Sequence, residues 1–193
     1  MRRRTFDALA TTAGLLIAGL LLVAGGLLTW GHNFVTSQVH TQLAAQKIVF
    51  PPASSPAVQG PQFAPMRQYG GQLMTTGAQA QVYADDFIAV HLKEIGGGQT
   101  YSQLSAKALA NPKDEALAAQ VQTMFRGETL RGLLLNAYAF WTIGQIMLYA
   151  AITAFAGAGL LILLAIFGFI HQHRTAPEAQ IFPTDTRVQA STS

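Results

Sequence analysis

Residues 132–170 read GLLLNAYAFWTIGQIMLYAAITAFAGAGLLILLAIFGFI, and these 39 consecutive residues include no Asp, Glu, Lys or Arg. A second charge-free stretch, ALATTAGLLIAGLLLVAGGLL, covers residues 8–28. A helix needs about 20 mainly apolar residues to cross the hydrocarbon core of a bilayer. Neither stretch has the alternating pattern of outer-membrane barrel strands. The sequence therefore predicts two transmembrane helices, at residues 8–30 and 146–170.

The longer stretch predicts a helix that is longer than one membrane crossing requires. Its 39 residues would make about 58 Å of helix, against a hydrocarbon core of about 30 Å. Tyr138, Phe140 and Trp141 are suited to the aromatic belt at the membrane surface. We therefore expect the span itself to begin near residue 146, with residues 133–135 above the membrane and packed under outer helices.

Basic residues predict the orientation of both spans. Arg2, Arg3 and Arg4 precede the first span, and Arg174 and Arg187 follow the second. Basic residues favour the cytoplasmic side, so we expect a cytoplasmic N-terminus at residues 1–7 and an extracytoplasmic region at 31–145. The polar, proline-containing tail at 171–193 is expected to be cytoplasmic and disordered. The first span exceeds the usual length of a signal-peptide core and lacks an A-x-A site, which predicts an uncleaved anchor in the cytoplasmic membrane.

The composition excludes several classes of function. Only 11% of the 193 residues are charged and none is cysteine, so disulfides, iron–sulfur clusters, thiolate zinc sites and thiol nucleophiles are ruled out. No basic stripe with interleaved aromatic residues suggests a nucleic-acid partner. The chain has no G-x-S-x-G, P-loop or H-E-x-x-H motif. We expect no enzyme activity and no cofactor.

The region between the spans reads as a small all-α domain. Apolar residues at helical spacing predict a helix that extends the first span over 32–43 and another that ends at Gly96–Gly98. Thr100 is expected to cap a third helix, and Asn111 followed by Pro112 a fourth. The proline-rich segment 51–65 is expected to be a loop. No stretch has the sustained alternation that would predict a strand.

The stretch ADDFIAVHLKEIGGG, residues 84–98, holds the residue types of a metal or acid–base site. At 100° per residue, Asp85 and Asp86 point away from the apolar face, which predicts solvated surface charges. His91 lies within that face and Glu94 one turn further on, at the spacing of a hydrogen-bonded pair. His91 and Glu94 are weak candidates for metal ligands, because His32 and His40 are the remaining histidines of this region. We expect His91 and Glu94 to form a hydrogen-bonded pair that stabilises the helix, and we expect no bound metal.

Two groups of residues are candidates for helix contacts or interactions. Ala150, Ala154 and Ala158 form a small-xxx-small row, which permits close approach of a second helix. Leu134, Tyr138 and Trp141 are expected above the second span, where they could contact outer helices, a partner or a ligand.

The segments FRGETLRGLLLNAYAFWTIGQ (125–145), YADDFIAVHLKEI (83–95) and GQTYSQLSAKA (98–108) carry a resemblance. The chain resembles a group of uncharacterised actinobacterial envelope proteins, some of which are labelled aromatic ring-opening dioxygenases. The resemblance covers most of the chain from the first span through the second. It implies two spans enclosing a domain of about this size, and it implies no functional residue.

These observations favour a non-catalytic accessory or assembly subunit, anchored in the cytoplasmic membrane. Its expected partners are membrane lipids and a larger membrane complex or further copies of the chain. One alternative is a lipid- or small-molecule-binding module that uses an apolar groove beside Leu134 and Tyr138. Another is a metal-dependent enzyme that uses His91 and Glu94.

Overall fold

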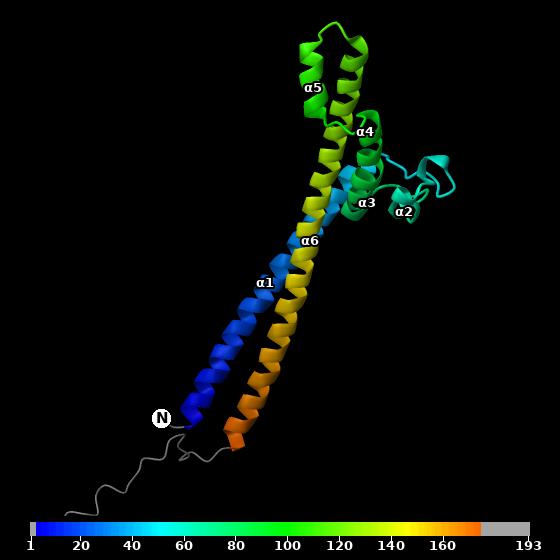
Figure 1. Ribbon diagram of the computed structural model, residues 1–193. Helices are drawn as coiled ribbons and strands as arrows, with labels where there is room; N and C mark the ends of the chain where they lie inside the picture. The colour runs from blue at the N-terminus through cyan, green and yellow to red at the C-terminus, as the bar shows by residue number, and fades with distance from the viewer. Residues whose placement is uncertain (1–2, 175–193) are drawn as a thin grey trace, which may run out of the picture. The chain divides into compact units, whose positions relative to one another are not determined.

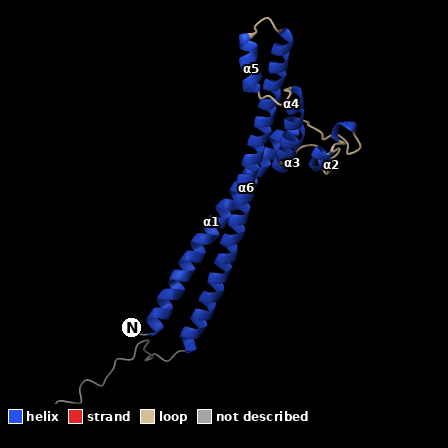
Figure 2. Ribbon diagram, viewed as in Figure 1, coloured by secondary structure: helices blue, strands red, loops and turns tan. Residues whose placement is uncertain are grey.

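The computed structural model describes residues 3–174, which form helices and loops without a β-strand (Figures 1 and 2). The all-α prediction is therefore confirmed for this part of the chain. The predicted disordered tail lies outside the described residues from residue 175 onward, as do residues 1 and 2 of the predicted basic N-terminus.

Two long helices contain both charge-free stretches. Helix α1 spans Arg3–Ala45 and helix α6 spans Glu115–Arg174. By length and composition, the segments Asp7–Ala45 and Glu115–His171 are long and apolar enough to cross a membrane. The prediction of two such helices is confirmed at this level.

Shorter elements lie between α1 and α6 along the chain. They are the 3₁₀ turns η1 (Pro56–Val58) and η2 (Pro61–Phe63), and the helices α2 (Ala64–Arg67), α3 (Gly77–Val82), α4 (Ala89–Ile95) and α5 (Tyr101–Ala110). A π-helical turn, η3 (Tyr83–Ile88), joins α3 to α4. The predicted helix ending at the glycine run is thus continuous from residue 77 to residue 95.

The helix caps were predicted with mixed success. Thr100 caps α5, where its hydroxyl accepts a hydrogen bond from the Gln103 backbone N–H, and the Thr100 N–H donates one to Gln103 Oε1. The cap predicted at Asn111 is wrong, because Asn111 ends α5 instead. Asp114 caps α6, since its Oδ1 accepts a hydrogen bond of 2.9 Å from the Leu117 amide. A carboxylate there also suits the positive end of the helix dipole.

The chain divides into two compact units. We call the first the helix-pair unit; it takes the chain up to Trp30 and from Leu148 onward. We call the second the core unit, Gly31–Met147.

In the helix-pair unit, α1 and α6 pack through small residues. The buried residues are Gly25 and five alanines: Ala18, Ala151, Ala154, Ala158 and Ala165. Gly25 lies under the Phe155 ring, and a Cβ at this position would come within 2.8 Å of it. The large apolar side chains point outward instead, and Leu20 is 71% exposed. The small residues therefore set how closely the two helices approach.

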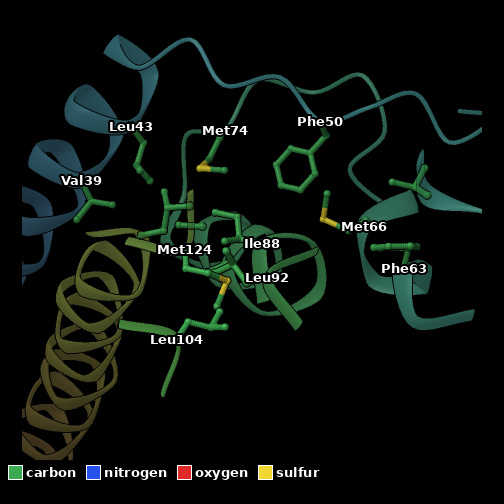
Figure 3. Close-up of a cluster of buried hydrophobic side chains, with 14 residues drawn as sticks. Val39, Leu43, Phe50, Phe63, Met66, Met74, Ile88, Leu92, Leu104 and Met124 are labelled. Carbon is green, nitrogen blue, oxygen red and sulfur yellow. The ribbon is translucent and has the colours of Figure 1, made fainter. Parts of the chain in front are cut away.

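The core unit is built around large buried side chains. Phe50, Met66, Met74 and Met124 are almost completely buried, and Figure 3 shows them with residues from α1, α4 and α5 around the same cluster. The Phe50 ring lies 5.3 Å from the rings of both Tyr69 and Tyr83. Burying such side chains is the main source of stability for a domain in water.

The predicted loop supplies part of this core. Segment 51–65 was expected to be a loop without regular structure, but it forms η1 and η2, and its residues Val58 and Phe63 are buried. Arg67 holds the segment in place by donating hydrogen bonds to the carbonyl oxygens of Val58 and Gly60. The backbone of Phe50 pairs with that of Gln72 and Gly71. These bonds hold Phe50 and its neighbours against the helices.

Candidate functional site: an uncharged groove between α1 and α6

Within the core unit, the α1 segment from Phe34 to Gln46 and the α6 segment from Leu130 to Phe140 border a groove of about 460 Å³. Val39, Leu43 and Leu134 are buried at its base. Large apolar side chains that remain exposed line the rest, namely Phe34, Leu130, Leu133 and Phe140. Cavities of this volume lie in the range of small-molecule sites.

The polar groups of the groove are all amides. Gln38 and Gln42 line it from α1, Gln46 lines it from the turn that follows α1, and Asn136 lines it from α6. Residues four apart lie on one ridge of a helix, so the glutamines form a row along one wall. Amide side chains offer both donors and acceptors without a charge. No charged residue lines the groove within the described part of the chain.

A histidine fixes the two walls to each other below the groove. His32 Nδ1 on α1 lies 2.8 Å from the carbonyl oxygen of Gly144 on α6. A carbonyl oxygen only accepts hydrogen bonds, so Nδ1 carries the proton. Gly144 permits this approach, because a Cβ there would already lie 3.3 Å from Thr36 Oγ1. The spacing of α1 and α6 at the groove is therefore set by residues outside its lining.

The structure separates the three predicted interaction residues above the second span. Leu134 lies at the base of the groove, as the groove hypothesis requires. Tyr138 does not line the groove, and its ring stacks on that of Trp141 at 6.3 Å. Trp141 packs against α3, where a Cβ at Gly77 would overlap its side chain. Trp141 thus holds α3 against α6.

The predicted alanine row lies in the helix-pair unit. Ala154 and Ala158 are buried between α1 and α6, while Ala150 is exposed. The buried row is continued instead by Ala151 and Ala165. These residues pack the chain against itself, so their small size is already explained by the contact with α1.

His91 and Glu94 do not form the expected pair. His91 Nδ1 donates a 2.7 Å hydrogen bond to the carbonyl oxygen of Phe87, one turn back. The His91 ring packs between Phe63, at 5.6 Å, and Phe87, at 4.4 Å. Glu94 is exposed to solvent. Among the described residues, no group of three His, Cys, Asp or Glu side chains could hold a metal ion.

The acidic pair is less solvated than expected. Asp85 Oδ1 accepts a hydrogen bond of 2.9 Å from Arg131 Nη2 and forms an ion pair across to α6. Burial and the neighbouring charge of Asp85 raise the pKa of Asp86 above its ordinary value. Both residues belong to the π-helical turn η3. A π-helical turn departs from the 100° spacing of a regular helix, which is the spacing on which the outward placement of both carboxylates was predicted.

The sequence reading missed most of the groove. The glutamine row could have been found from its spacing of four residues on a predicted helix. Phe34, Leu130 and Leu133 have no such local pattern, because they meet only when α1 and α6 pack in one register.

Comparisons of the chain with protein-family models, with curated proteins and with solved structures find no match. Function is therefore inferred from the residues themselves.

Proposed function

We propose that the protein is a non-catalytic accessory subunit anchored in the cytoplasmic membrane by α1 and α6. The core unit would lie outside the cytoplasm and contact a larger membrane assembly or a further copy of the chain. The observation that carries this proposal is the exposure of large apolar side chains on both units.

In the helix-pair unit, this exposure favours lipid as the surrounding medium. Only 11% and 22% of the residues in the two most apolar helix windows are buried. A core helix of a soluble domain would bury most of such a window. Large apolar residues facing outward are stable where the solvent is hydrocarbon, and small residues then mediate helix contact.

The orientation rests on the basic ends of the chain. Arg2, Arg3 and Arg4 precede the first apolar segment, and Arg174 follows the second. Basic residues beside a membrane span favour the cytoplasmic face. Both ends would therefore be cytoplasmic, with residues 31–145 on the opposite side.

In the core unit, exposed apolar residues on the hairpin of α5 and α6 favour a protein partner. Leu109 is 81% exposed near the end of α5, and Phe125 is half exposed against Tyr101. Exposed apolar side chains of this kind are available to the apolar core of a protein interface.

The test is to cross-link cells, extract the tagged full chain in a mild detergent and measure what it retains. We expect one or more protein partners in fixed ratio. Leu109→Gln should lower their recovery about tenfold, as expected when a central apolar anchor is removed. Lys107→Gln, on the same exposed helix, is the matched control and should leave recovery unchanged. Recovery of the wild-type chain as a monomer alone would refute the proposal.

A further inference from the structure

The dimensions of the α1/α6 groove limit what can occupy it. Its lining runs from Phe34 in α1 to Gln46 just after the end of α1, which at 1.5 Å per residue is about 18 Å. The volume of the groove is about 460 Å³. The groove is therefore elongated along α1, and its length suits an extended chain.

The charge of the groove is the second limit. Its lining is apolar at the base, with amides from Gln38, Gln42, Gln46 and Asn136 along its walls. A carboxylate or phosphate buried among these residues would lack a cationic partner and would be strongly disfavoured. An uncharged occupant is favoured, with apolar surface against Val39 and Leu43. Amide groups can still hydrogen-bond an ester or hydroxyl group at its end.

The position of the groove along the chain is the third observation. Phe34 follows the charge-free stretch 8–28 after six residues, and Phe140 lies within the stretch 132–170. Both walls are therefore formed by the helices that would anchor the protein. In a membrane, the abundant molecules with long uncharged chains and a separate polar head are the lipids themselves.

We infer that the groove binds one acyl chain of a membrane glycerolipid, whose ionic headgroup stays outside the lining. The chain lies along α1 between the glutamine row and the apolar side chains of α6. This inference rests on the membrane anchoring in the proposed function, but it requires no protein partner. It makes the core unit a lipid-binding module and gives the groove an occupant of defined chemistry.

The test uses the full chain reconstituted in phosphatidylcholine vesicles that contain phosphatidylcholine with a diazirine in one acyl chain. After irradiation, mass spectrometry of the digested protein locates the cross-linked residues. We expect cross-links on Phe34, Leu133 or Phe140 as well as on the two apolar segments outside the groove, residues 8–28 and 146–170. The segment cross-links report the anchoring, and the groove cross-links report the site.

Two tryptophan variants provide the matched comparison. Ala137→Trp fills the groove, since Ala137 lines it, whereas Ala139→Trp places the same side chain at an exposed position outside the lining. We expect Ala137→Trp to abolish the groove cross-links and Ala139→Trp to retain them. Gln42→Glu, at an exposed wall position, should also reduce them because it adds a charge without a partner. This variant keeps the test valid if Ala137→Trp fails to fold.

Three results would overturn the inference. Groove residues without cross-links, while the apolar segments are labelled, would show an anchored protein with no acyl chain in the groove. Groove cross-links that persist in both Ala137→Trp and Gln42→Glu would show non-specific labelling. In a parallel sample of the Leu133→Cys variant, a disulfide between two copies together with loss of the groove cross-links would show that a second chain fills the groove. Loss of the segment cross-links would instead refute the anchoring itself, and this result is distinct from the other three.

Discussion

In the helix-pair unit the buried residues are alanines and a glycine, and large apolar side chains such as leucine, isoleucine and phenylalanine are exposed. In the core unit phenylalanine and methionine are buried instead. Phe167 and Phe50 illustrate the difference, because the first is 66% exposed and the second is completely buried. Water favours burial of the largest apolar surface, while in hydrocarbon only close packing and polar contacts hold helices together. The two units therefore have the side-chain distributions suited to two different solvents.

The largest expected effect comes from removing a phenylalanine in each unit. Phe50→Ala should destabilise the core unit by about 3–5 kcal/mol, through lost burial and the cavity left beside Tyr69 and Tyr83. Phe167→Ala should change stability by less than about 0.5 kcal/mol, because its side chain leaves no cavity in the protein. The measurement is thermal unfolding of both variants in detergent, followed by near-ultraviolet circular dichroism. Equal destabilisation by the two substitutions would break the comparison.

The reverse change, from small to large, should act on the helix-pair unit. Ala158 is completely buried between α1 and α6, and Ala156 is exposed on the same helix. Ala158→Leu should cost about 1–3 kcal/mol through overpacking and separate the helices. Ala156→Leu should have little effect.

The helix separation can be measured with a short bismaleimide cross-linker, because the chain has no cysteine of its own. Cysteines introduced at Leu21 and Gly157 are suitable, since a Cβ at Gly157 would lie 3.4 Å from Leu21 Cδ1. We expect the cross-linking yield to fall in Ala158→Leu and to persist in Ala156→Leu. Equal yields would mean that the alanine row does not set the helix contact.

The sequence was sufficient to predict features that depend on neighbouring residues. The charge-free stretches predicted both long apolar helices, and apolar residues at helical spacing predicted the helix that ends at Gly96–Gly98. The cap at Thr100 was predicted because it needs only Thr100 and the following turn. Each of these depends on local geometry, which a single segment determines.

The features that were missed depend on distant contacts or on irregular backbone. Val58 and Phe63 are buried because Arg67 and the Phe50 backbone hold their loop against the helices. The π-helical turn breaks the 100° rule on which the outward placement of Asp85 rested. The groove itself depends on the register in which α1 packs against α6, and this register cannot be predicted from either segment alone.

The smallest expected effect concerns Asp86, at the edge of the core unit. If the core unit excludes water, as the comparison of the two units implies, a negative charge on Asp86 should lower the stability of the core unit. Burial, together with the negative charge of Asp85, raises the pKa of Asp86 above its ordinary value of 3.8. The folded state therefore binds this proton more tightly than the unfolded state does.

The sign of the pH dependence follows from that difference. The stabilising contribution of protonated Asp86 is complete below pH 3.8, its unfolded pKa, and is lost as the pH rises through the raised value. Asp86→Asn keeps the shape of the side chain without the charge. We therefore expect the variant to melt slightly above wild type at pH 7 and together with it near pH 3. Glu94→Gln removes a charge from an exposed position of α4 and should show no such difference between the two pH values. If Asp86→Asn melts below wild type at pH 7, the Asp86 carboxylate stabilises the core unit, and its surroundings are more polar than the comparison implies.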